Sequence, residues 1–173
     1  QDALFIVARR GALMQAMPDG EMLAVALSED DLSGELEEGV SIAAINAPAR
    51  CVVAGDGAAI SRLRAKLDKR DIDCRPLQTS HAFHSAAMDG MLDDFAAAFT
   101  GIFLHPPKVP FVSNLSGTYI DDKQATDPAY WVAHVRQCVR FADGLATLRE
   151  GTGRVLLEVG AGRALCTFAG QPL

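Results

Sequence analysis

The fold is decided by residues 21–77, which read EMLAVALSEDDLSGELEEGVSIAAINAPARCVVAGDGAAISRLRAKLDKRDIDCRPL. Short apolar runs alternate here with amphipathic stretches and end at polar, glycine or proline residues, as expected of strands and helices joined by turns. Ser28 with Asp31 three residues later resembles a capping box, which marks the start of a helix. The pattern predicts, in order, a strand over 22–27, a helix from residue 28, strands over 40–45 and 51–54, a helix with Ile60, Leu63 and Leu67 on one face, and a strand over 72–77. This βαββαβ order is typical of a ferredoxin-like α+β unit, which we predict over residues 21–80.

The segments on either side predict a different architecture. Residues 1–20 carry an amphipathic helical pattern, and the apolar residues between Met88 and Phe99 form a second helical stripe. Asp127-Pro128 has the composition of a helix start. Residues 109–112 read as a short strand, and residues 155–159, VLLEV, as a continuous apolar strand of the kind buried in a parallel sheet. We therefore assign residues 1–20 and 81–173 to an α/β core.

Composition and charge exclude several classes of function. The net charge of −6 argues against nucleic acid or an anionic membrane as partner, because both attract basic surfaces. The cysteines are widely spaced, which favours reduced thiols over a disulfide framework or a zinc site. No apolar run reaches the roughly 20 residues of a membrane span. These features predict a soluble, cytoplasmic protein without a bound metal.

The clearest functional motif is the heptapeptide TSHAFHS at residues 79–85, which holds two of the four histidines of the chain. Further motifs occur in a fixed order along the sequence. They are RRGALMQ at residues 9–15, NAP at 46–48, YW at 130–131, VRF at 139–141 and LEVG at 157–160.

Together and in this order, these motifs resemble the acyltransferase domains of modular polyketide synthases, which belong to the malonyl-CoA:acyl carrier protein transacylase family. The resemblance extends over essentially the whole chain. It implies an α/β-hydrolase-like core with an inserted ferredoxin-like subdomain, in agreement with the two patterns described above. It also implies transfer of a malonyl unit from malonyl-CoA, through an acyl-serine, to the phosphopantetheine thiol of an acyl carrier protein, beside a ketosynthase domain of the same synthase.

The resemblance assigns roles to particular residues. His84 matches the family's catalytic histidine, which would activate the serine hydroxyl as a general base. Its other ring nitrogen would be oriented by a backbone carbonyl, which we expect at Asn114. Arg10 matches the arginine that binds the malonyl carboxylate, a task suited to a planar guanidinium.

His81 and Phe83 occupy the variable positions of the motif. The form HAFH accompanies malonyl units in this family, whereas YASH accompanies methylmalonyl units. Phe83 would fill the space that a C2 methyl group needs, although one methyl group changes discrimination by only about 1–3 kcal/mol.

The nucleophile of the family is absent from the sequence. Its serine lies in a GHSxG elbow before the arginine, and no GxSxG occurs in the 173 residues. Ser80, Ser85 and Ser116 lack the flanking glycines. We therefore expect the serine upstream of residue 1, and the chain alone to be inactive.

Other interpretations remain open at this stage. A stand-alone malonyl transacylase of fatty-acid synthesis shares the motifs, although HAFH favours the polyketide enzymes. A non-catalytic structural or carrier-docking module is a second alternative, for which the basic residues between Arg62 and Arg70 offer a surface. The turn Gly160-Ala161-Gly162 lacks the rest of a phosphate-binding motif, so no bound cofactor is expected.

Overall fold

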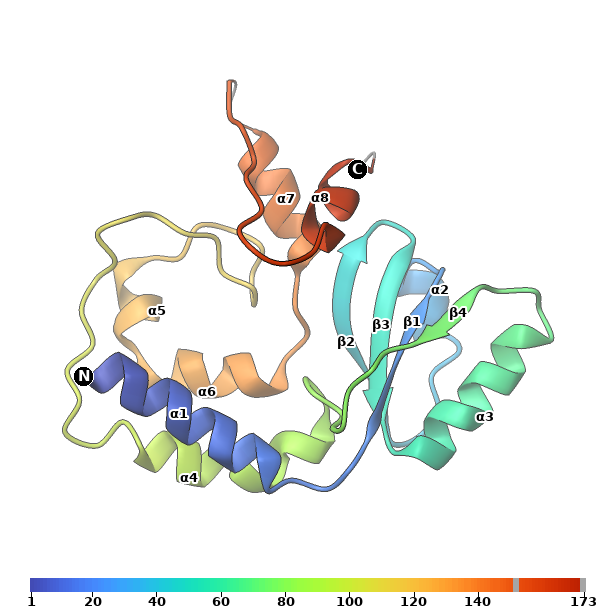
Figure 1. Ribbon diagram of the computed structural model, residues 1–173, viewed down its shortest axis with the longest axis horizontal. Coiled ribbons are helices and arrows are strands. Elements are labelled where there is room, and N and C mark those ends of the chain that lie inside the picture. Colours follow the sequence, from blue (N-terminus) through green and yellow to red (C-terminus); the bar gives the residue numbers. More distant parts are fainter. Residues whose placement is uncertain (151–152, 172–173) are drawn as a thin grey trace.

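A computed structural model describes residues 1–150 and 153–171; the remaining residues, 151–152 and 172–173, fall in the last predicted unit and lie outside this description. Its sheet is four-stranded and antiparallel, with the order β2-β3-β1-β4. The strands are β1 (Glu21–Val25), β2 (Val40–Ala47), β3 (Arg50–Gly55) and β4 (Cys74–Pro76), and the helices α2 (Glu29–Ser33) and α3 (Gly57–Asp68) connect them. This order and connectivity confirm the predicted ferredoxin-like unit, which forms one side of the molecule (Figure 1).

The two faces of the sheet are buried against different partners. Leu23, Val25 and Val53 contact the apolar side of α2 and α3. The alternate residues Met22 and Val52 point to the opposite face, where they pack with Ala82 of the TSHAFHS segment. We call this segment, residues 79–85, the histidine motif. Because side chains alternate along a strand, the same strands bury a helical layer on one side and the histidine motif on the other.

A group of helices forms the other part of the molecule. They are α1 (Asp2–Gln15), the 3₁₀ helix η1 (Ala86–Met91), α4 (Leu92–Ala97), α5 (Asp122–Thr126), α6 (Pro128–Arg136), α7 (Phe141–Arg149) and α8 (Ala164–Ala169). Figure 1 shows α1 running along α4, with α6 beside them. The predicted apolar stripe between Met88 and Phe99 is confirmed as the core of this group, packed against Leu13 and Val135.

Local hydrogen bonds set the starts of one helix in each part of the molecule, α6 and α2. The Asp127 carboxylate accepts the Ala129 amide at 2.8 Å, and Pro128 occupies the first turn, as the sequence predicted. The Ser28 hydroxyl accepts the Asp31 amide at 3.2 Å and starts α2. Among the described residues, no helix is long and apolar enough to cross a membrane.

The predicted strand over residues 155–159 is wrong for this structure. The segment has no regular secondary structure and joins no sheet, and Val155 and Leu157 are 91% and 84% exposed. A parallel strand needs a neighbouring strand to satisfy its backbone groups, and no described strand lies beside this one. Glu158 instead accepts the amides of Leu165 (3.2 Å) and Cys166 (2.9 Å) at the start of α8. The short strand predicted over 109–112 is reduced to an isolated bridge between Val112 and Tyr119.

Gly20 allows the histidine motif to approach the sheet. Its amide donates to the Ser80 carbonyl at 3.1 Å. A Cβ atom at Gly20 would lie 2.7 Å from the Cβ and 2.8 Å from the backbone nitrogen of Ala82. Both distances are shorter than van der Waals contact, so a larger residue would push the motif away from the sheet.

We expect Gly20→Ala to lower the free energy of unfolding by about 1–3 kcal/mol, the usual cost of overpacking. Gly11→Ala is a matched control, because a Cβ there meets nothing within 4 Å. Gly11 lies inside α1, where alanine is favoured over glycine by about 0.5–1 kcal/mol, so this control should be slightly stabilised. Urea denaturation of both variants measures the difference. Equal stability of Gly20→Ala and the unsubstituted chain would contradict the close approach.

Candidate active site

The histidine motif crosses from β4 to η1 in a constrained conformation. His84 has φ = +57°, a left-handed conformation that residues other than glycine adopt rarely. The buried Ser85 hydroxyl donates to the Ala82 carbonyl at 2.6 Å and accepts the Ala87 amide at 3.2 Å. Strain of this kind persists only where surrounding contacts hold it, and it concentrates at functional sites.

The His84 ring is oriented by a backbone carbonyl. Its Nδ1 lies 2.9 Å from the carbonyl oxygen of Gln137, at the end of α6. A carbonyl only accepts, so Nδ1 carries the proton and Nε2 keeps a free lone pair. His84 therefore has the tautomer that a general base needs.

Our expectation that Asn114 supplies this carbonyl is wrong. The Asn114 carbonyl accepts the backbone amide of Arg140 at 2.8 Å instead. The Asn114 side-chain amide lies 3.2 Å from Nε2 of His134. Asn114 is thus part of the site, but it supports a second histidine and not the candidate base.

His134, on α6, is a site residue that the sequence analysis missed. Its ring packs edge-on against His84, with ring centroids 6.1 Å apart and an interplanar angle of 81°. Tyr130 and Trp131 lie against its other sides, each with a centroid distance of 6.4 Å. The Asn114 amide donates to Nε2, so the proton of the neutral ring is on Nδ1, which is buried without a partner.

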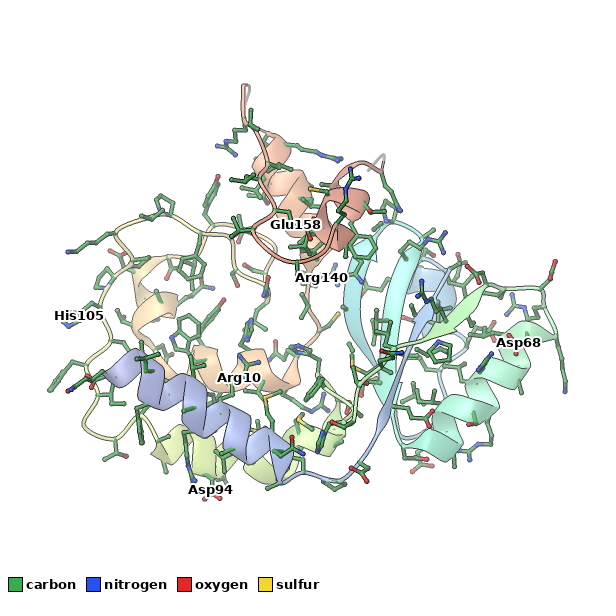
Figure 2. The ribbon with its side chains drawn as sticks, viewed as in Figure 1. Arg10, Asp68, Asp94, His105, Arg140 and Glu158 are labelled. Carbon is green, nitrogen blue, oxygen red and sulfur yellow. The ribbon has the colours of Figure 1, made fainter. Side chains whose placement is uncertain are left out.

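Arg10 approaches the two histidines from α1. Figure 2 shows it on the edge of α1 that faces α6. Its Nε is buried and has no hydrogen-bond partner among the described residues, and burial lowers the pKa of its guanidinium from the ordinary value. A partly buried guanidinium without a carboxylate partner is unfavourable, so this side chain is well placed for an anionic ligand. Arg9, its neighbour in the sequence, is exposed.

Burial and charge keep both histidines neutral. Desolvation is the main cause that lowers the pKa of His84, and the Arg10 charge adds to it, while the bond to Gln137 partly opposes it. The pKa of His134 falls to about 4, through desolvation first and then the charge of Arg10. An unprotonated His84 at neutral pH can accept a proton from a hydroxyl group.

His81 and Phe83 are the residues of the motif that pack toward the interior of the protein. His81 is 3% exposed, and its Nδ1 lies 2.7 Å from the Ser80 hydroxyl. The two rings stack at a centroid distance of 5.9 Å. Phe83 also packs against both the helical core and the sheet, so its position is fixed from two sides.

An apolar cavity lies beside Arg10, lined by residues of α1, α4 and α6. It has a volume of about 530 Å³ and is lined by Ile6, Phe95, Phe99 and Trp131, with Arg10 at its wall. His81, Phe83 and His84 do not line it. The described residues contain no group of three or more metal-ligating side chains that could hold an ion.

The serines near the site are engaged elsewhere. Ser80 bonds to His81, Ser85 to the Ala82 carbonyl, and Ser116 to Thr118. None of these three hydroxyls contacts His84. The described residues therefore place a candidate base and a cationic side chain together, whereas the hydroxyls of Ser80, Ser85 and Ser116 have other partners.

Comparison with known proteins identifies the family. Residues 1–171 match the model of the acyl transferase domain family. The chain is 41% identical over 165 residues to a component of the phenolphthiocerol/phthiocerol polyketide synthase of Mycobacterium tuberculosis, and the match covers 95% of this chain and 11% of that protein. The chain therefore belongs to the acyl transferase domain family. Within it, the chain corresponds to part of an acyltransferase domain of the modular polyketide synthase type.

Solved structures agree with this assignment. The acyl transferase domain of SpnD, in complex with 2-(pent-4-yn-1-yl)malonyl, matches with a TM-score of 0.91 and 42% identity, covering 97% of this chain and 41% of that one. FabD from Acinetobacter baumannii has the same fold, with a TM-score of 0.88 at 23% identity over 98% of this chain and 57% of that one. These neighbours confirm the fold class, an α/β-hydrolase-like core with a ferredoxin-like subdomain. The chain spans less than half of the SpnD domain and about a tenth of the Mycobacterium tuberculosis protein.

The two features that sequence reasoning missed differ in how visible they were. Gln137 contributes through its backbone carbonyl, which every residue has, so no residue type reveals it. His134 had a signal, because it follows Tyr130 by four residues and Trp131 by three, on one face of α6. A histidine that shares one face of a helix with aromatic residues is expected to be shielded from water by them.

We expect His134 to titrate at about pH 4 in the folded chain, against 6.5 for a free histidine. NMR of the imidazole Cε1–H groups measures this directly. Because the unfolded chain binds a proton between these two values that the folded chain does not, stability should fall as pH drops from 6.5 to about 4. His84 contributes in the same direction, since its pKa is also lowered.

The variant His134→Asn serves as control. The imidazole signal that is missing from its spectrum is the signal of His134. Without the titrating ring, its unfolding free energy should depend less steeply on pH over the same interval. An imidazole of His134 that titrates near pH 6.5 would show that the ring is solvated, contrary to the packing described above.

Proposed function

We propose that this chain supplies the general base and the carboxylate clamp of a malonyl-specific acyltransferase in polyketide synthesis. The malonyl unit passes from malonyl-CoA to an active-site serine and then to the phosphopantetheine thiol of an acyl carrier protein. The serine belongs to a GHSxG elbow upstream of this chain. The observation that carries the proposal is that Arg10 on α1 and His84 in the histidine motif, which lie far apart in the sequence, come close enough in one partly buried site for the Arg10 charge to lower the pKa of His84.

His84 acts on the serine through Nε2. This atom accepts the serine proton as the serine oxygen attacks the thioester carbonyl, and the carbon–sulfur bond to coenzyme A then breaks. The proton passes from Nε2 to the departing thiolate. In the second half-reaction, Nε2 accepts the proton of the phosphopantetheine thiol and returns it to the serine oxygen when the acyl–serine bond breaks.

Arg10 selects for the carboxylate of the extender unit. Within the described residues its buried Nε has no hydrogen-bond partner, and the lowered pKa of its guanidinium reflects a cation that is partly removed from water. A bound carboxylate would supply that counter-ion through charge-assisted hydrogen bonds. Acetyl groups would leave the cation unpaired and are disfavoured for that reason.

His81 and Phe83 set the selectivity for malonyl over larger units. Their stacked rings and their packing against two apolar clusters support this role, because a fixed Phe83 does not yield to a C2 methyl group. The higher identity to the SpnD domain, 42% against 23% for FabD, favours polyketide over fatty-acid synthesis. The remaining partners in this proposal are the acyl carrier protein and the neighbouring ketosynthase domain, and no resident cofactor is needed.

A role limited to docking has less support. Four of the five basic side chains between Arg62 and Arg70 are paired with carboxylates of the same unit: Arg62 with Glu37 at 3.0 Å, Lys66 with Glu35 at 3.0 Å, Arg64 with Asp68 at 3.7 Å, and Arg70 with Glu35. Such pairing reduces the positive charge of the face that would attract an acidic carrier protein. A module that only docks a carrier protein would not need Arg10 and His84 to lie together in one site.

The proposal is tested by the intact mass of the protein before and after addition of malonyl-CoA. The 173-residue chain should gain nothing, whereas the same chain expressed with the GHSxG segment that precedes it in its synthase should gain one malonyl group. In that longer protein, His84→Ala should abolish the gain, because no other base reaches the serine. Acylation at an unchanged rate in His84→Ala would remove His84 as the base.

Arg10 is tested in the same longer protein by competition between malonyl-CoA and acetyl-CoA. Arg10→Ala should lower malonyl transfer and shift the preference toward acetyl, by roughly tenfold or more, since a charge-assisted bidentate contact is lost. Arg10→Lys is the matched control, because it keeps the charge and loses the planar fork, and it should recover only part of the preference. An unchanged preference in Arg10→Ala would exclude the clamp.

The motif is tested by replacing His81 with Tyr and Phe83 with Ser, which creates YASH. The ratio of methylmalonyl to malonyl transfer should rise by roughly tenfold, within the range of about 1–3 kcal/mol that a single methyl group supplies. His84 is unchanged in this variant, so total acylation should persist. A constant ratio would leave the motif without a role in selectivity.

A further inference from the structure

Residues 137–140, between α6 and α7, connect the candidate base to the ferredoxin-like unit. We call this segment the junction. Its first residue, Gln137, accepts the His84 Nδ1–H through its carbonyl at 2.9 Å. Two residues later the chain leaves the helical part and contacts the sheet.

Val139 extends the sheet at its edge. Its amide donates to the Ala43 carbonyl at 2.9 Å, and its carbonyl accepts the Ile45 amide at 2.9 Å. This is a parallel bridge to β2, the outer strand on that side of the sheet. The backbone position of the junction is therefore set by the ferredoxin-like unit.

Arg140 fixes the junction through its side chain. Its Nη1 donates to both carboxylate oxygens of Glu29, at 2.8 and 2.9 Å, and its Nε donates to Asp143 at 2.6 Å. Its backbone amide donates to the Asn114 carbonyl at 2.8 Å. Figure 2 shows Arg140 where α7 meets the sheet. Glu29 is the first residue of α2, so this ion pair joins the ferredoxin-like unit to the helical part.

We propose that Glu29 is a positioning residue for His84. Through Arg140 it holds the junction against β2, and the junction in turn presents the Gln137 carbonyl that fixes the tautomer and direction of the His84 ring. The ferredoxin-like unit thus has a function beyond packing, since it sets the geometry of the base from a distance. The proposal rests on the role of His84 put forward above, and it concerns a hydrogen bond that can be observed without catalysis.

The geometry favours Glu29 over Asp143 as the residue that matters. Asp143 lies three residues after Arg140 on α7, so their contact is local and would persist if the junction moved away from the sheet. The contact between Glu29 and Arg140 joins residues of two different units and would be lost in the same movement. Both partners are partly exposed, at 31% for Arg140 and 40% for Glu29, so we expect a moderate effect.

The test is ¹⁵N NMR of the histidine rings in the folded 173-residue chain at neutral pH. In the unsubstituted chain, His84 should be predominantly the Nδ1–H tautomer, with its Nδ1 proton protected from exchange. Glu29→Gln, which removes the charge and keeps the shape, should raise the exchange rate of this proton and of the Ile45 and Val139 amides by roughly fivefold, the effect of about 1 kcal/mol. The amides of α1 and α4 should keep their exchange rates.

Glu37→Gln is the matched control. Glu37 pairs with Arg62 at 3.0 Å in the same unit, away from the junction. It should leave the His84 signals unchanged. A second comparison uses Arg140→Gln, which should show the same change at His84, and the double variant with Glu29→Gln, which should add nothing further.

Each outcome decides the matter. Changes at His84 in Glu29→Gln but not in Glu37→Gln support the proposal. A His84 ring that keeps its tautomer and exchange rate in Glu29→Gln overturns it and leaves the role of His84 as base intact. Equal changes in both variants would show a general loss of stability and also overturn it. Survival of acylation in His84→Ala, by contrast, contradicts the proposed function and not the coupling.

Discussion

The hydrogen bond from His84 Nδ1 to the Gln137 carbonyl is the constraint on which the site depends. It joins the histidine motif, which follows β4, to the end of α6, and it decides which ring nitrogen is free for chemistry. His84 remains in its left-handed backbone conformation because this bond and the packing of His134 hold its ring. The carbonyl is in turn located by the pairing of Val139 with β2.

Near this bond lie the basic side chains of His84, His134 and Arg10, which are all partly buried. Of the three, only Arg10 is charged at neutral pH. Desolvation lowers the pKa of both His84 and His134, and the guanidinium of Arg10 reinforces the effect on each. Protonation of His134 at Nε2 would also set an N–H group against the Asn114 amide that donates to it. The chain as a whole has a net charge of −6, so an anionic ligand of the kind proposed would be attracted by this local cation and not by the overall field.

Membership of the acyl transferase domain family and the geometry of the site agree on a division of labour. The described residues hold a candidate base and a cation in one place, whereas the sequence contains no GxSxG serine. The ferredoxin-like unit contributes to this arrangement in two ways. One face of its sheet packs against the histidine motif, and its edge strand pairs with Val139 of the junction, two residues after Gln137.

The sequence by itself determined the ferredoxin-like unit and the residues to examine, because both depend on local patterns. Alternating apolar residues and turn residues encode the βαββαβ order, and His84 and Arg10 belong to short motifs that can be read without coordinates. The tertiary structure alone decided the partner of His84, since a backbone carbonyl has no signature in the sequence and the Asn114 carbonyl was already bonded to Arg140. It likewise decided that residues 155–159 form no strand here. Apolar character makes a strand possible, but only a neighbouring strand can satisfy its backbone hydrogen bonds.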